Sequence, residues 1–262
     1  MKDKFKICVL GAGGTGSYFL KEFSRYLYNN NKAAAQIISL SIVDADRVEG
    51  KNLVRQAYME EDIGMSKASV LSSVLNDGFG LEWKGFARYL LKTDDFEDFF
   101  PIKLKQAIPI LIGCVDNHAC RLVCEEYFRS QTDCIYMDSA NEFSCGEVVF
   151  AVKRDGKVLS PLRSAVFPDI KKGDLRNVEE LSCTELNEVA PQHIAANMNA
   201  GMILLSAMTT LLEEGVCVTG MTLFDVKQMS SVHYPPNRSL LEQEGGGASD
   251  GRKGKSRSVK KA

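Results

Sequence analysis

The sequence contains no C-x-x-C pair, no long apolar run and no apolar leader at its start. Its eight cysteines are scattered over 262 residues, so we expect neither the usual structural zinc site nor a disulfide framework. No run approaches the roughly 18 to 20 apolar residues of a membrane span, and the first residues lack the pattern of a signal peptide. These absences predict a reduced, cytoplasmic protein without zinc and without contact with a membrane.

Acidic residues are missing from the last dozen positions, which carry six lysines and arginines. Residues 1 to 250 therefore hold 26 basic against 34 acidic side chains, a net charge of −8. Such an acidic body argues against a broad nucleic-acid surface. We expect one domain over residues 1–240 and a flexible basic tail over residues 241–262. The tail either stays solvated or contacts a polyanion such as DNA.

A glycine-rich turn follows the first predicted strand, Phe5 to Leu10. The turn reads G-A-G-G-T-G and contains Gly11, Gly13, Gly14 and Gly16. A helical pattern of apolar residues comes next, so backbone N–H groups of the turn and of the helix start can approach phosphate oxygens. The motif occurs in NAD enzymes, flavoproteins and ATP enzymes, and it does not separate them.

The second predicted strand, residues 37–43, ends in two carboxylates, Asp44 and Asp46. A carboxylate at this place in a dinucleotide fold accepts hydrogen bonds from ribose hydroxyls. A group of hydrogen-bond donors suited to a polyphosphate follows: Asn52, Arg55, Gln56 and Lys67. An NAD-dependent dehydrogenase has no use for these donors, whereas an enzyme that displaces pyrophosphate needs cations beside the leaving group. For any one of these residues alone, a polar loop is the simpler interpretation.

After a weaker strand at about residues 83–86, a strongly apolar strand, Ile108 to Cys114, leads through Val115 to Asp116 and Asn117, and a helix is expected from about His118. In an open parallel sheet the ligand lies beyond the carboxyl ends of the strands, so Asp44 and Asp116 can face one crevice. Asp116 is a candidate magnesium ligand, and it is also a candidate cap of the following helix.

Taken in order, these motifs resemble those of the ThiF/MoeB/HesA family, the bacterial relatives of ubiquitin-activating enzymes. The match covers G-x-G-G-x-G, D-x-D, N-x-x-R-Q, a lysine and D-N-x-x-x-R within residues 6–153, and it resumes at Ser182-Cys183 and a helix over 191–212. Chain length and the divergent second half most resemble the ThiF-type proteins of the plasmid-associated PRTRC gene cassette. The resemblance implies a Rossmann-like, doubly wound α/β fold whose mostly parallel sheet has antiparallel strands in its C-terminal part.

The resemblance also implies an ATP- and magnesium-dependent adenylyltransferase. Its partner would be a small ubiquitin-like protein ending in Gly-Gly, whose carboxylate attacks ATP to give an acyl adenylate and pyrophosphate, and the assembly would be a homodimer. Arg55, Lys67 and Asp116 would act in catalysis, and Asp116 would hold Mg²⁺. The ATP-binding residues implied by matching position are Gly11, Gly13, Gly14, Gly16, Asp44, Asp46, Asn52, Arg55, Gln56, Lys67, Asp116 and Asn117.

Several features depart from the family pattern. The family commonly takes an arginine from an N-terminal helix of the partner subunit, and only four residues precede the first strand here. Cys183 is either a nucleophile or a packed cysteine, and the segment at about 154–182 is expected to be a crossover loop. His118, His193 and His233 are isolated in the sequence and receive no role. A catalytically weak nucleotide-binding scaffold of a plasmid-associated system and an NAD-dependent oxidoreductase stay open as alternatives.

Overall fold

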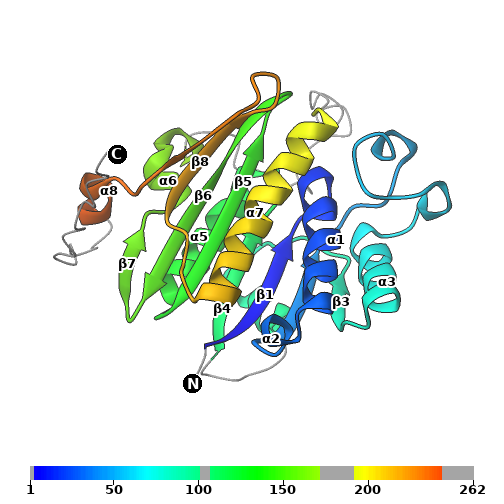
Figure 1. Cartoon of the computed structure of the whole chain (residues 1–262), viewed down its shortest axis with the longest axis horizontal. Coiled ribbons are helices and arrows are strands. Elements are labelled where there is room, and N and C mark those ends of the chain that lie inside the picture. The colour runs from blue at the N-terminus through cyan, green and yellow to red at the C-terminus, as the bar shows by residue number, and fades with distance from the viewer. Residues whose placement is uncertain (1–2, 101–106, 172–191, 244–262) are drawn as a thin grey trace, which may run out of the picture.

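The protein is built on one mixed sheet, described here from a computed structural model that covers residues 3–100, 107–171 and 192–243. Nine strands lie in the order β3-β2-β1-β4-β5-β6-β8-β9, and β7 pairs with β6. Figure 1 shows the strands side by side across the middle of the molecule. The predicted Rossmann-like fold class is confirmed.

The first five strands are mutually parallel, and the later ones are antiparallel to their neighbours. Parallel strands need a crossover between them, so the helices of the first half lie against the faces of the sheet. The parallel strands are β1 Lys4–Leu10, β2 Ile37–Val43, β3 Trp83–Phe86, β4 Ala107–Gly113 and β5 Cys134–Asn141. The antiparallel strands are β6 Cys145–Arg154, β7 Lys157–Ser160, β8 Gly220–Asp225 and β9 Ser230–Tyr234.

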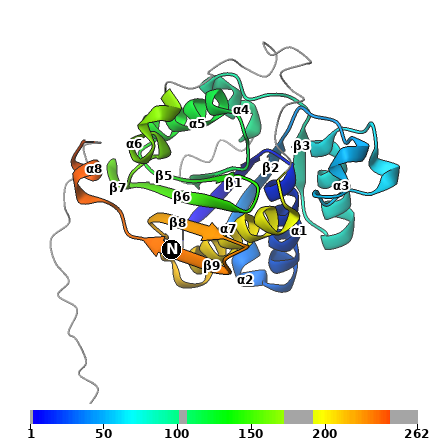
Figure 2. The same cartoon turned by 90° about the horizontal axis from the view of Figure 1, so that it is seen from above.

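Helices cover both faces of the sheet, with α1 and α7 on one face and α4, α5 and α6 on the other (Figure 2). The helices are α1 Gly14–Asn29, α2 Asn31–Ala34, α3 Lys67–Phe79, α4 Phe96–Phe99, α5 His118–Ser130, α6 Arg163–Val166, α7 Ile194–Glu214 and α8 Arg238–Gln243. Short 3-10 turns occur at Gly50–Asn52, Glu60–Asp62, Thr93–Asp95 and Pro168–Lys171.

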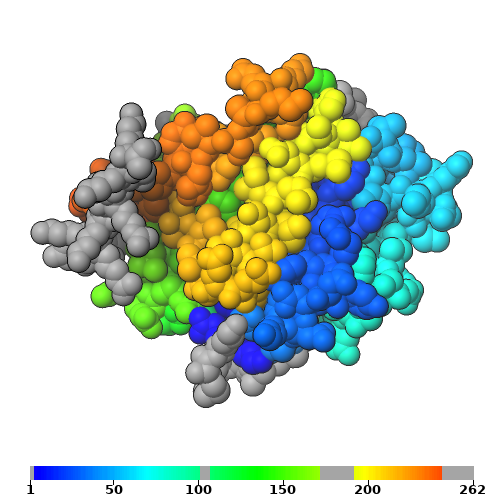
Figure 3. All heavy atoms as spheres, in the orientation of Figure 1, coloured from blue at the N-terminus to red at the C-terminus, as the bar shows by residue number. Residues whose placement is uncertain are grey.

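The longest helix, α7, is uncharged over most of its length. By length and composition alone it could cross a membrane, which differs from our expectation that no run is long enough. Leu204 and Met208 are fully buried, and a side chain at Gly201 would stand 3.2 Å from the backbone nitrogen of Phe19. Figure 3 shows α7, in yellow, between α1 and the β8–β9 hairpin. The helix thus packs closely on α1 and the sheet along one side.

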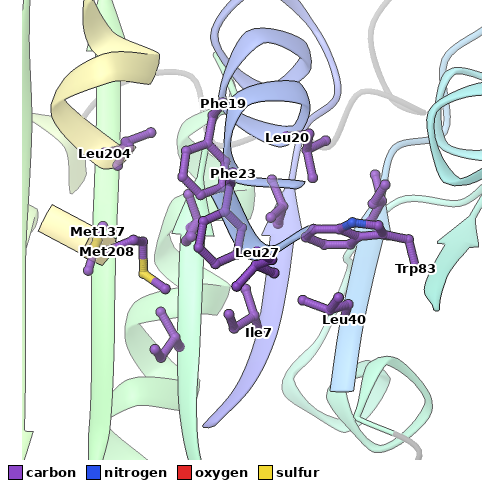
Figure 4. Close-up of a cluster of buried hydrophobic side chains, with 14 of the residues drawn as sticks. Ile7, Phe19, Leu20, Phe23, Leu27, Leu40, Trp83, Met137, Leu204 and Met208 are labelled. Atoms are coloured by element: carbon purple, nitrogen blue, oxygen red, sulfur yellow. The ribbon is translucent and has the colours of Figure 1, made fainter. Parts of the chain in front are cut away.

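Alternation along the strands divides the core into two layers. Phe5, Ile7 and Val9 of β1 belong to the layer under α1 and α7, and Cys8 and Leu10 to the layer under α4 and α5. This is the result of successive side chains in a strand pointing to opposite faces. Figure 4 shows the first layer, where side chains of α1 and α7 meet those of the sheet. The buried layers fix the strand ends that carry the polar residues.

Short regular elements lie inside two of the predicted segments. The crossover loop expected at about 154–182 begins with regular structure, because β7 and α6 occupy residues 157–160 and 163–166. Its remainder from residue 172 lies outside the described residues. The tail predicted to start at 241 overlaps α8, which continues to Gln243, and residues 244–262 also lie outside the described part of the chain. The sequence did not predict the short helix α6 because it has no apolar stripe. Buried ion pairs of Arg163 hold this helix in place instead.

Candidate nucleotide-binding site

A cleft of about 830 Å³ lies at the carboxyl ends of the parallel strands. It brings together eleven of the predicted site residues from three separate segments, the β1–α1 turn, the β2–α3 connection and the β4–α5 loop. Those that line it are Gly11, Gly13, Gly14, Asp44, Asp46, Asn52, Arg55, Gln56, Lys67, Asp116 and Asn117. Gly16 lies inside α1, and Cys183 lies outside the described residues.

The turn between β1 and α1 requires glycine at two positions. Gly11 has φ +92°, and a side chain there would stand 2.5 Å from the carbonyl oxygen of Cys114. A side chain at Gly16 would collide with the carbonyl oxygen of Gly11. Gly13 precedes α1 without a side-chain cap, so the first N–H groups of this helix are free to bind an anion.

Asp44 accepts hydrogen bonds from the backbone N–H groups of Ala12, at 2.6 Å, and Asp46, at 2.8 Å. Burial raises the pKa of this carboxyl to about 6, against the opposing effect of the Lys67 ammonium. The folded protein therefore binds this proton more tightly than the unfolded chain, and Asp44 lowers stability as the pH rises through about 4 to 6.

The predicted ribose contact of Asp44 needs the ionised carboxylate, and its ionised fraction falls about tenfold between pH 7 and pH 5. The affinity for adenosine is therefore expected to fall by about that factor. Adenosine is the right ligand because it has no phosphate that titrates in this range. Isothermal titration calorimetry across the range measures the effect. Asp44→Asn should bind weakly and without the pH dependence, and an equal slope in this variant would contradict the assignment.

The hydrogen-bond donors that follow β2 differ in whether their side chains already have partners within the described part of the protein. Asn52 is buried and accepts a hydrogen bond from the Glu49 N–H at 2.8 Å. Gln56 is also buried, and its Oε1 atom has no hydrogen-bond partner among the described residues. Arg55 is half-buried, and its guanidinium makes no ion pair within the described part of the chain. Arg55 is thus an unpaired cation of the cleft, whereas Arg47, which also lacks an ion pair there, donates to the Gly64 carbonyl oxygen at 2.7 Å.

Lys67 differs from the expectation of a free phosphate contact. Its side chain is buried at the start of α3, and its ammonium pairs with Asp46 at 2.9 Å. An ammonium has three N–H donors, so the pair leaves Lys67 able to donate to a second acceptor in the cleft. The role of Lys67 toward phosphates and that of Asp46 in nucleotide binding stay predictions.

Asp116 and Asn117, in the loop after β4, have different surroundings. The Asn117 side chain caps α5 by accepting a hydrogen bond from the Cys120 N–H at 2.9 Å, so Asp116 is not the cap. Asp116 is exposed in the cleft. Among the described residues no group of three or more histidines, cysteines or carboxylates could hold a metal ion. Mg²⁺ needs only one or two carboxylates when substrate phosphates and water complete its shell, so Asp116 fits such an ion bound with a nucleotide.

Arg121 is a residue whose place the sequence did not reveal. It is buried beneath the cleft and donates to the Asp138 carboxylate at 3.2 Å. It also donates to the carbonyl oxygens of Ser139, at 3.0 Å, and Val115. Because Val115 directly precedes Asp116, Arg121 fixes the loop that carries the candidate magnesium ligand.

Arg163, on α6, completes the buried ion-pair network. It pairs with the second oxygen of Asp138 and with Glu147, and it donates to the Asp138 carbonyl oxygen at 2.9 Å. The neighbouring Ser164 donates its N–H at 2.8 Å and its hydroxyl to the buried Glu125 of α5. Arg121 is the arginine of the D-N-x-x-x-R motif, but the motif alone assigned it no role. No signal in the sequence pairs Asp138 with Arg163.

The glycine turn, the carboxylate after β2 and the cleft at the strand ends define a Rossmann-like protein with a candidate nucleotide site. The chain belongs to the ThiF family, whose model matches residues 3–240. The family resemblance seen in the sequence is therefore confirmed.

Two curated relatives match shorter parts of the chain. The NEDD8-activating enzyme E1 catalytic subunit of Dictyostelium discoideum is 32% identical over 77 residues, which are 29% of this chain and 15% of the relative. The SUMO-activating enzyme subunit uba-2 of Caenorhabditis elegans is 30% identical over 121 residues, 44% of this chain and 18% of the relative. The matches thus span less than a fifth of either relative.

Two solved structures share the fold over most of the chain. E. coli MccB with AMPCPP and selenomethionine MccA has a TM-score of 0.62 at 14% identity and covers 89% of this chain and 64% of MccB. PaaA has a TM-score of 0.62 at 15% identity and covers 88% of this chain and 72% of PaaA. At these identities the likeness concerns the fold alone.

Proposed function

We propose that this chain is an ATP-dependent adenylyltransferase that activates the C-terminal carboxylate of a small ubiquitin-like or sulfur-carrier-like protein. The observation that carries the proposal is the cleft, which holds the glycine turn, the ribose acceptor Asp44, the unpaired cation Arg55 and the exposed carboxylate Asp116. Membership of the ThiF family supports the same reaction class, as do relatives named for activating NEDD8 and SUMO.

In the proposed reaction a carboxylate oxygen of the partner attacks the α-phosphorus of ATP. The bond from this phosphorus to the oxygen that bridges to the β-phosphate breaks, which yields an acyl adenylate and pyrophosphate. The attacking carboxylate is already ionised at neutral pH. No residue of the cleft has to remove a proton, so orientation and charge stabilisation account for the catalysis.

Each part of the cleft has a separate task in this reaction. The N–H groups of the glycine turn and α1 bind phosphate oxygens, and Asp44 accepts from the ribose. Arg55 and Lys67 offset the charge that develops on the leaving pyrophosphate. Asp116 would hold Mg²⁺, which neutralises phosphate charge when it is bound.

A second candidate function is a nucleotide-binding scaffold without turnover. The Lys67–Asp46 ion pair favours it, because one of the two cations near the phosphates already has a partner. Mass spectrometry of a candidate small protein ending in Gly-Gly, after incubation with ATP and Mg²⁺, separates the two functions. An added adenylyl group supports the adenylyltransferase, whereas ATP binding without this product for any candidate partner supports the scaffold.

The proposed assembly is a homodimer formed through the outer side of α7. Ile194, Met198 and Met202 stand one turn apart on this helix and are 38%, 45% and 51% exposed. Figure 3 shows the hairpin next to α7 on this face. An apolar stripe of this kind on a surface helix is typical of a contact between subunits.

Replacing both Met198 and Met202 with glutamate is expected to make the protein monomeric, because two charges would be buried at the contact without partners. Sedimentation equilibrium measures the result. Val74→Glu is the matched control, since Val74 is an apolar residue of α3 with 57% exposure, and it should leave the assembly unchanged. A dimer that persists in the double variant would place the contact elsewhere.

A further inference from the structure

We propose that His118 is a phosphate-binding residue of this cleft, with Nε2–H as the donor and Arg121 as the group that fixes its tautomer. The nature of the ligand rests on the proposed function. The position of the donor nitrogen rests on the side chains alone.

The tautomer follows from the contact between the two side chains. Nδ1 of His118 lies 3.3 Å from a terminal nitrogen of Arg121. A guanidinium carries only donors, so Nδ1 must accept this hydrogen bond. In the neutral ring the proton then sits on Nε2, because one ring nitrogen donates whenever the other accepts.

Arg121 is held too firmly to turn away from this contact. Its other nitrogens donate to Asp138 at 3.2 Å and to the carbonyl oxygens of Val115 and Ser139. The guanidinium is 3% exposed, so release from these partners would leave a buried charge without compensation. The imidazole is therefore oriented by a fixed partner before any ligand arrives.

The His118 side chain belongs to the cleft wall. His118 is the first residue of α5 and lines the cleft beside Asn117 and Asp116. Within the described part of the chain Nε2 makes no hydrogen bond. The positive end of the α5 dipole and the Arg121 charge both favour an anionic acceptor at this place. A phosphate oxygen of a nucleotide whose magnesium is held at Asp116 fits that description.

The first test is the nitrogen shifts of His118 in ¹⁵N-labelled protein at pH 7.5, assigned by comparison with His118→Leu. The expected spectrum has an unprotonated Nδ1 and a protonated Nε2. A protonated Nδ1, or fast exchange between the two tautomers, would overturn the inference whatever the ligand is.

The second test is binding of AMPCPP and of adenosine to His118→Leu and His118→Gln. The loss of one hydrogen bond to a charged group should weaken AMPCPP binding by about 10- to 100-fold in His118→Leu, with adenosine binding unchanged. His118→Gln should restore most of the affinity, because its amide places an N–H near the position of Nε2.

His233→Leu, on the β8–β9 hairpin outside the cleft, is the control and should bind both ligands as the wild type does. Thermal unfolding shows whether each variant is folded. Equal AMPCPP affinity in wild type and His118→Leu would overturn the role of His118 and leave the proposed function standing. Failure of the wild type to bind AMPCPP would instead overturn the proposed function, and the phosphate role with it.

Discussion

Asp138→Leu is expected to lower the free energy of unfolding by about 3–5 kcal/mol, the usual cost of removing one partner from a buried ion pair. Asp138 is 1% exposed and lies between the guanidinium groups of Arg121 and Arg163, which are each 3% exposed. Leucine removes the carboxylate that these two buried charges share, which leaves Arg121 without a carboxylate partner among the described residues, whereas Arg163 keeps Glu147. Urea unfolding at pH 7 measures the loss.

Asp98→Leu is the matched control for this measurement. Asp98 pairs with Arg88 at 2.7 Å, but both side chains are exposed to water. An exposed pair contributes about 0–1 kcal/mol, so the control should unfold almost as the wild type does. Similar losses for the two variants would show that the buried network does not organise the strand ends.

Arg55→Ala is expected to reduce magnesium-dependent exchange of pyrophosphate into ATP by at least about 10²- to 10³-fold, the effect of losing one group that stabilises developing charge. Arg55 lines the cleft and has no ion-pair partner among the described residues, so no carboxylate has to be displaced before it contacts a phosphate. Initial rates with a partner protein that supports exchange measure the effect.

Arg25→Ala supplies the control, because Arg25 is an exposed residue of α1 that pairs only with Glu22 of the same helix. Its exchange rate should equal that of the wild type. Thermal unfolding of Arg55→Ala should also be unchanged, since the side chain is half-buried and holds no neighbour. Normal exchange by Arg55→Ala would remove this residue from the reaction.

Local patterns predicted the fold and the position of the cleft. The largely apolar strands β1, β2 and β4 are followed by the glycine turn, by Asp44 and by the loop that carries Asp116. Such strand ends meet at one edge of a sheet whatever their distance in sequence. The glycine turn was predictable because Gly11 adopts a positive φ and Gly16 has no room for a side chain. These constraints are local, so the sequence displays them.

The parts that escaped prediction depend on contacts between distant residues. Arg163 and Asp138 are 25 residues apart, and the first lies in a segment without periodicity that we predicted to be a loop. Asp46 and Lys67 were both predicted to bind the nucleotide, but nothing in their spacing shows that they pair with each other. His118 looked isolated because its partner Arg121 is one turn further along the same helix. Pairing of side chains is decided by packing.

Exchange of labelled pyrophosphate into ATP by the purified wild-type chain, with Mg²⁺ and a candidate small protein, tests the adenylyltransferase most directly. The reaction is reversible before the acyl adenylate is consumed, so an active enzyme returns label to ATP. The account predicts exchange that requires both Mg²⁺ and the partner and disappears when the two C-terminal glycines of the partner are removed. Tight ATP binding without exchange for every small protein ending in Gly-Gly would contradict it and leave a nucleotide-binding scaffold.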